Sequence, residues 1–205
     1  MEFEIVTRGA LEYVRSRLLQ DAPHCFSTRL GGGSAGSLAS LNLGIHRGDQ
    51  PERVLRNYEI LGQAVGFAPE QTVFTRQTHT DIVARVGREN RGEGLFRPVE
   101  PERDGLVTDE PGVTLTIFTA DCTPILFYDP VRQAVGAAHA GWRGTAAGIA
   151  ARTVNRIWLR RAGVRQIAIC PDCTACLPHR YWSHRVTRGD RGSMASFIQL
   201  PQEGL

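Results

Sequence analysis

Short apolar runs bounded by turn residues dominate the middle of the chain. Residues 113–118, 124–128 and 134–138 form three such runs, and Asp129-Pro130 closes the second one as a turn. Runs of this length between turn residues are typical of buried strands. We therefore predict three strands here, and the residues that follow the first and the third run should lie at strand ends.

The pattern elsewhere predicts more strands and three helices. Apolar residues three to four positions apart indicate helices, and continuous apolar runs indicate strands. The helix predicted at 50–65 has Pro51 in its first turn and is followed by Gly66, and these are the usual residues at the start and the end of a helix. The ranges are helices at 10–20, 50–65 and 145–162, strands at 2–6, 23–29, 72–75, 81–86 and 167–169, and loops at 31–37 and 87–103. This mixture predicts an α+β fold, residues 1–205 forming one domain with a mixed β-sheet core flanked by helices.

The composition limits the partners and the catalytic groups that can be expected. The formal net charge is only +3, so binding to nucleic acid or to a membrane is not expected. All 24 basic residues are arginine, which excludes catalysis by lysine and requires any anion site to use arginine, backbone N–H groups or a metal. The start of the chain lacks the pattern of a signal peptide, and the five cysteines are an odd number. We expect a cytoplasmic protein with free or metal-bound thiols.

A thiol and two imidazoles stand out as candidate ligands. Cys122 and His139 follow predicted strands, and His79 lies upstream in Gln77-Thr78-His79. One thiolate and two imidazoles are a normal zinc set that leaves the fourth position open, as in catalytic sites. The spacing alone also allows a small buried cysteine and two ordinary hydrogen-bonded histidines.

Seven motifs in one order give a more specific indication. Together they resemble the laccase-domain family of purine nucleoside phosphorylases, also called polyphenol oxidase-like or peptidoglycan-editing-factor-type proteins, from about Cys25 to Gly163. The resemblance implies a metal, zinc or else copper, held by His79, Cys122 and His139. The motifs are Thr28-Arg29-Leu30-Gly31-Gly32, Ser40-Leu41-Asn42-Leu43-Gly44, His46-Arg47-Gly48-Asp49, Gln77-Thr78-His79, Asp104-Gly105-Leu106-Val107-Thr108, Ala120-Asp121-Cys122 and His139-Ala140-Gly141-Trp142-Arg143-Gly144.

The resemblance also implies roles for residues around the metal. Cys122, Asp121 and Arg143 are the candidate catalytic residues, and Asp121 would act as a base or as a partner of the metal ligands. Arg29, Asn42 and Arg143 are the candidate substrate-binding and phosphate-binding residues. The two arginines suit phosphate because a guanidinium binds two oxygens at once, although pairing with a carboxylate is an alternative use.

The expected activity is phosphorolysis of adenosine, inosine and methylthioadenosine, with nucleoside and phosphate as the small-molecule partners. Deamination of adenosine is a second activity that the resemblance implies. The alternatives are copper-dependent oxidation of polyphenols, editing of peptidoglycan precursors, and nucleoside binding without turnover. A multi-copper centre needs clustered histidines, whereas the six histidines of this chain are spread out.

The C-terminal part departs from the family pattern. Cys170, Cys173, Cys176 and His179 follow one another at three-residue steps, which suggests either a second metal site or ordinary thiols. Residues 181–185 and 192–198 resemble the end of the family's sequence. A helical block that family members carry between these parts is missing, so we expect a shortened C-terminal region.

Overall fold

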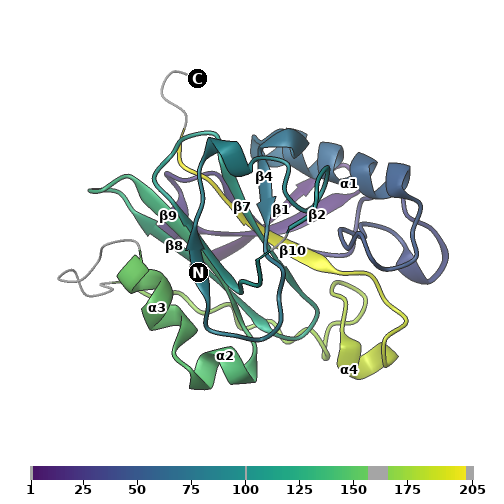
Figure 1. Ribbon diagram of the computed structural model, residues 1–205. Helices are drawn as coiled ribbons and strands as arrows, with labels where there is room; N and C mark the ends of the chain where they lie inside the picture. The colour runs from purple at the N-terminus through teal and green to yellow at the C-terminus, as the bar shows by residue number, and fades with distance from the viewer. Residues whose placement is uncertain (1, 100, 157–165, 202–205) are drawn as a thin grey trace.

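Two β-sheets lie face to face, and a helix covers the outer side of each, in the computed structural model (Figure 1). The structure describes residues 2–99, 101–156 and 166–201. The first sheet has the strand order β1-β2-β3-β10-β7-β4, and the second has the order β5-β6-β9-β8. The strands are β1 Phe3–Arg8, β2 Leu11–Ser16, β3 His24–Ser27, β4 Thr72–Phe74, β5 Val83–Arg85, β6 Gly105–Thr108, β7 Thr114–Thr119, β8 Thr123–Asp129, β9 Ala134–Ala140 and β10 Met194–Ile198.

Both sheets are mixed. β4 pairs with β7 and β5 pairs with β6 in parallel, and the other pairs are antiparallel. The prediction of a single α+β domain with a mixed β core and flanking helices is confirmed, although the core contains two sheets. The predicted strands of the central region are also confirmed as β7, β8 and β9.

Side chains on opposite faces of the strands of the first sheet pack into two separate parts of the core. On β7, Leu115 and Ile117 pack between the two sheets, whereas Phe118 packs on the side of the first helix. Phe197 and Ile198 of β10 divide in the same way. Successive side chains of a strand point to opposite faces, so one apolar strand serves two layers.

Helix α1, Pro51–Val65, covers the first sheet as predicted. Val54, Tyr58 and Leu61 form its buried stripe, and Gly66 ends the helix in the left-handed conformation at φ 98°. The stacked rings of Tyr58 and Phe74, with centroids 5.5 Å apart, join this helix to β4.

The predicted helix at 145–162 is wrong in its extent. The chain forms α2, Trp142–Ala146, and then α3, Ile149–Arg156, with Gly148 between them at φ +80°. A left-handed residue breaks the helical hydrogen-bond pattern, and glycine adopts it without steric cost. Ile149 anchors α3 on the second sheet, and the rest of the predicted helix lies outside the described residues.

Two further predictions are corrected. Residues 10–20 form β2 and the short 3₁₀ helix Arg17–Leu19 rather than an α-helix. A turn at Gly9 pairs β2 with β1, and Leu11 and Tyr13 are buried in the core cluster beneath α1, so tertiary contacts override the helical spacing. Residues 167–169 form no strand, and Ile169 is 80% exposed.

The loops at 31–37 and 87–103 are confirmed, apart from single turns of helix. Among the described helices, none is long and apolar enough to cross a membrane. The remaining short helices are the 3₁₀ segments Gly36–Leu38, Pro69–Gln71 and Arg88–Asn90 and the α-helix α4, His184–Thr187.

Candidate functional site

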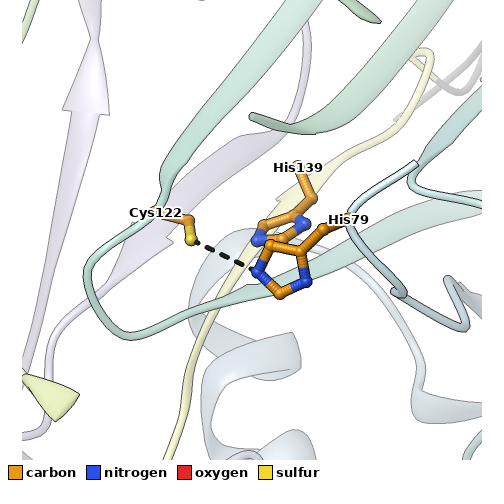
Figure 2. Close-up of side chains that lie close together, drawn as sticks. All are labelled: His79, Cys122 and His139. Atoms are coloured by element: carbon orange, nitrogen blue, oxygen red, sulfur yellow. Dashed lines mark hydrogen bonds between the residues drawn. The ribbon is translucent and has the colours of Figure 1, made fainter. Parts of the chain in front are cut away.

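The three candidate ligands meet at one end of the sheets. The ligand atoms of His79, Cys122 and His139 all lie within 4.8 Å of one another, and Figure 2 shows the three side chains pointing toward a common point. Sγ of Cys122 lies 3.9 Å from Nε2 of His79, and the two imidazole centroids are 4.9 Å apart. Residues separated by up to 60 positions in the sequence are thus brought together by the fold.

The position of the Cys122 thiol is set by the turn that connects the two sheets. Cys122 lies in the turn from β7 to β8, where the chain passes from the first sheet to the second. His139 is the next-to-last residue of β9 and shares the strand parity of Val135 and Ala137, which pack between the sheets. Because side chains alternate along a strand, His139 faces the same interior and is almost fully buried.

A buried carboxylate organises the loop that carries His79. Asp104 accepts hydrogen bonds from the backbone N–H groups of Thr78, His79 and Thr80 at 2.9–3.2 Å, and from the hydroxyl of Thr80 at 3.0 Å. His79 has φ 64°, a left-handed conformation that is unfavourable for histidine. The three bonds to one carboxylate hold the loop in this conformation, which directs the imidazole toward Cys122.

The same carboxylate orients the buried imidazole. Oδ1 of Asp104 lies 2.7 Å from Nδ1 of His139. Burial by itself would raise the pKa of Asp104, but the hydrogen bonds from His139, Thr80 and Thr78 lower it to about 2. The ionised carboxylate accepts a hydrogen bond from the Nδ1–H group of His139, which leaves Nε2 of that ring free to bind a metal ion.

A glycine leaves room for the site. A Cβ atom on Gly141 would lie 2.6 Å from Cδ2 of His79 and 3.5 Å from Sγ of Cys122. The first distance is shorter than a side chain tolerates, so residue 141 must be glycine if His79 is to keep its place. Sequence reasoning did not assign Gly141 a role, although it lies in one of the quoted motifs.

These ligands fit a zinc ion. In a tetrahedral site with Zn–N of about 2.0–2.1 Å and Zn–S of about 2.3 Å, nitrogen and sulfur ligands lie about 3.6 Å apart. The observed 3.9 Å between Cys122 and His79 requires only a small contraction. Burial, with a contribution from Asp121, raises the pKa of Cys122, and metal coordination is the ordinary means of stabilising such a thiolate. The contact of Asp104 with His139 is the carboxylate–histidine arrangement that accompanies metal ligands.

Asp121 points toward the C-terminal segment rather than toward a metal ligand. Its carboxylate accepts hydrogen bonds from the hydroxyls of Thr174 and Ser183 at 2.9 and 2.7 Å and from the backbone N–H of Arg185 at 2.9 Å. Burial opposes ionisation, but these bonds lower the pKa of Asp121 below its ordinary value. The contacts favour a role in holding the segment against the Cys122 turn, and a catalytic role stays a prediction.

Asn42 is buried, and its side-chain amide is used within the protein. Its nitrogen donates to Gly44 and Asp49, and its oxygen accepts from the backbone N–H groups of Gly44 and Ser193. An amide has two donor and two acceptor positions, so all four are occupied. The predicted contact of Asn42 with substrate would require these bonds to break.

The two predicted phosphate-binding arginines differ in their surroundings. Arg29 donates to the carbonyls of Ala39 and Pro178, and its guanidinium lies 3.7 Å from the ring centroid of Trp182. Arg143 is exposed on α2 and lies over the ring of Trp142 at 5.2 Å. Arg29 therefore joins two loops, whereas Arg143 is available to a ligand.

Sequence reasoning missed a second pair of arginines. Arg191 lies close enough to Cys122 and Asp121 for its charge to affect theirs, and Nε of Arg191 is buried without a hydrogen-bond partner. Burial and then the positive charge of Arg47 lower the pKa of Arg191. Among the described residues, neither arginine forms an ion pair within 4.0 Å. Only the fold brings them together, because Arg47 follows the Asn42 motif and Arg191 precedes β10.

The cysteines of the C-terminal segment do not form a second cluster of metal ligands. In the part of the chain that the structure describes, His79, Cys122 and His139 are the one group of three candidate ligands found. Cys173, Cys176 and His179 are exposed, and Cys170 is partly buried. The alternative of free thiols is therefore the one that the structure supports.

Comparison with known families shows which protein family the chain belongs to. The family model described as "Multi-copper polyphenol oxidoreductase laccase" matches residues 23–158 and 152–201. The chain belongs to this family. The laccase-domain resemblance seen in the motifs is thus confirmed.

Members of the laccase family with assigned names are similar to the chain. "Purine nucleoside phosphorylase YlmD" of Geobacillus stearothermophilus is 44% identical, over 86% of this chain and 89% of that protein. "Purine nucleoside phosphorylase" of Deinococcus radiodurans is 44% identical over 66% of this chain and 49% of that protein. The crystal structure of the hypothetical protein YfiH of Bacillus licheniformis has a TM-score of 0.85 at 28% identity, covering 96% of this chain and 99% of that one.

The comparisons also bear on the C-terminal region. The alignment with the Geobacillus protein spans 245 positions, more than the 205 residues of this chain, so that relative has residues without a counterpart here. The two matches to the laccase family model overlap at residues 152–158, and the second one contains Cys170, Cys173 and Cys176. The shortened C-terminal region stays a prediction.

Proposed function

We propose that this chain is a purine nucleoside phosphorylase that uses zinc bound by His79, Cys122 and His139. Adenosine and inosine are the proposed substrates, and methylthioadenosine is a further one. The relatives named purine nucleoside phosphorylase support the reaction class, and the convergence of the three ligands within 4.8 Å supports the site. The observation that carries the proposal is Arg191, which lies close to Cys122 with Arg47 as its neighbour and has no ion-pair partner among the described residues.

The side chains around the metal have separate tasks in this proposal. Bound zinc would polarise an oxygen atom of the substrate or of water. Asp104 keeps Nδ1 of His139 protonated, and its bonds to the backbone fix the position of His79. Asp121 positions the turn that carries Cys122.

The arginines supply the charge that phosphate needs. Arg191 and Arg47 are neighbours, neither has a carboxylate within ion-pair distance in the part of the chain that the structure describes, and two such guanidinium groups attract an anion. Arg143, exposed at the start of α2, would also contact the phosphate or the ribose. Arg29 holds the loop of Ala39 to Pro178, and the bonds of Asn42 favour a similar structural role.

The proposed reaction exchanges one bond at the anomeric carbon of ribose. A phosphate oxygen forms a bond to this carbon, while the bond to the purine nitrogen breaks and the base leaves with the electron pair. The base then takes up a proton. The arginines hold the phosphate in place, which lowers the entropy cost of bringing two reactants together.

Two other reactions are secondary candidates. If water replaces phosphate and attacks C6 of the purine ring, the bond from C6 to the amino group breaks, ammonia leaves and adenosine becomes inosine, and we propose this deamination as a side activity. The description of the laccase family model favours copper and phenol oxidation. The described residues provide one group of three ligands, whereas a multi-copper centre needs several groups, so we rank oxidation below phosphorolysis. Peptidoglycan-precursor editing and binding without turnover stay hypotheses, and the free cysteines favour a reducing, cytoplasmic location.

The proposal is tested by the rate of phosphorolysis in ligand variants. Zinc-loaded protein is supplied with phosphate and either adenosine or inosine, and release of the free base is followed. Cys122→Ala and His139→Ala should lose both stoichiometric zinc and turnover. Cys25→Ser is the matched control, since Cys25 is buried in the core away from the ligand group and should retain zinc. Full turnover by Cys122→Ala without zinc would refute the assignment.

A further inference from the structure

Two exposed cysteines face each other across one turn of the C-terminal segment. The backbone N–H groups of Cys176 and Leu177 both donate to the carbonyl of Cys173 at 3.1 Å, which closes a tight turn. The first and fourth residues of such a turn have Cα atoms within about 7 Å. A disulfide spans Cα distances of about 4.4–6.8 Å, so the two cysteines are within bonding reach without refolding of the backbone.

Packing and a hydrogen bond hold the turn in place, although its thiols are exposed. Leu177 packs against a buried cluster that includes Tyr181, Trp182 and Met194. Pro178, just after the turn, accepts a hydrogen bond from Arg29 at 2.9 Å. These contacts hold the base of the turn, and Cys173 and Cys176 are exposed to reagents in solution.

The two thiols have unequal character. The interaction between the neighbouring thiols of Cys173 and Cys176 lowers the pKa of Cys173 and raises that of Cys176. Cys170, by contrast, is partly buried, and burial raises its pKa. A more acidic, exposed thiol with a second thiol beside it is the arrangement of redox-active Cys-X-X-Cys pairs.

We propose that Cys173 and Cys176 form a reversible dithiol–disulfide site that reacts with small-molecule disulfides. The thiolate of Cys173 attacks one sulfur of the disulfide, and the other sulfur leaves as a thiolate. Cys176 then loses its proton and attacks the sulfur of Cys173, releasing the second small thiol. The protein dithiol is oxidised by two electrons, and the small disulfide is reduced to two thiols.

The site is connected to the candidate metal centre. Thr174 lies inside the turn, and its hydroxyl binds Asp121, the residue before Cys122. This proposal is independent of the proposed phosphorolysis, because it rests on the turn and its two thiols alone.

The test uses the full chain loaded with zinc. The protein is equilibrated with reduced and oxidised glutathione at graded ratios, free thiols are blocked by alkylation, and the peptide that contains the turn is weighed by mass spectrometry. We expect a peptide with a single label, on Cys170, that is lighter by two hydrogen atoms than the same singly labelled peptide with two free thiols, and its fraction should rise with the oxidised share of glutathione. Full alkylation of Cys173 and Cys176 at the most oxidising ratio, or a disulfide to Cys170 instead, would overturn the proposal.

Serine variants test the order of attack. Cys176→Ser should accumulate the mixed disulfide with glutathione at Cys173, because no second thiol resolves it, and Cys173→Ser should form less of it. Cys170→Ser is the matched control and should still form the disulfide. Equal trapping in the Cys173→Ser and Cys176→Ser proteins would contradict the assignment of Cys173 as the attacking thiol.

Discussion

Oδ1 of Asp104 lies 2.7 Å from Nδ1 of His139, and the same carboxylate binds three consecutive backbone N–H groups of the loop that carries His79. One buried side chain thus positions two of the three candidate ligands. These contacts explain how residues from different sheets and loops come to share one site. Asp104 is the residue on which the geometry of the site depends most.

Replacing Asp104 with asparagine should weaken zinc binding by about 10–100-fold, the usual effect of losing a partner of a metal-bound histidine. An amide cannot accept all the hydrogen bonds that the carboxylate accepts, and it no longer fixes the His139 tautomer. Competition with a chelating dye measures the affinity. Asp109→Asn, at a partly exposed pair with Arg85, should retain the wild-type affinity. Equal affinities for both variants would show that Asp104 does not support the ligands.

Gly141→Ala should displace His79, since the new Cβ would lie 2.6 Å from its ring. We expect at least about a tenfold loss of zinc affinity, comparable to the loss of a supporting contact, with a melting temperature close to wild type. Gly33→Ala is the control, because the nearest atom to its Cβ is Oδ1 of Asn57 at 3.9 Å. Unchanged zinc affinity in Gly141→Ala would mean that His79 is not a ligand.

Arg191→Met should raise the KM for phosphate by about tenfold, since a hydrogen bond to a charged group contributes about 1.5–3 kcal/mol. The KM for the nucleoside should change little. Arg56→Met, which alters an exposed pair with Glu59 on α1, should leave both constants unchanged. An increase confined to the KM for nucleoside would contradict the phosphate role of Arg191.

The sequence predicted the strands of the site better than their surroundings. The apolar runs at β7 and β9 leave few other structures open, and the ligand motifs follow them. Residues 10–20 fit a helical spacing equally well, and the hairpin with β1 decides the outcome through contacts that no local pattern contains. At Gly148 the pattern predicted a continuous helix, but this residue adopts a left-handed conformation that interrupts it.

Site residues from distant segments were the hardest to predict. Arg47 and Arg191 become neighbours only when β10 joins the first sheet, so neither stands out in the sequence. Asn42 lies in a specific motif, but its four hydrogen bonds give it a structural role that a motif cannot distinguish from substrate contact. Motifs identify the residues that matter, and the contacts show what they do.

The hydrogen bonds to the carboxylate of Asp49 should make the free energy of unfolding depend on pH in the acidic range. Burial opposes ionisation, but hydrogen bonds from Ser34, Asn42 and the backbone of Gln50 lower the pKa of Asp49 below its usual value. The folded state thus favours the ionised form, so this stabilisation is present above the unfolded pKa of about 3.9 and is lost as the pH falls through the lower folded value.

Asp49→Asn should therefore be about 1 kcal/mol less stable than wild type near neutral pH, and the difference should shrink at about pH 3. Urea unfolding at the two pH values measures it. Asp109→Asn serves as the exposed control. A difference that stays constant with pH would show that the ionised carboxylate does not stabilise the loop.

The most direct test of the central claim is the identity of the products from adenosine. Zinc-loaded protein is incubated with adenosine, with and without phosphate, and the products are separated by chromatography. Our account predicts adenine and ribose 1-phosphate in equal amounts, and no adenine when phosphate is left out. Stoichiometrically bound zinc with no adenine in the presence of phosphate would contradict the account.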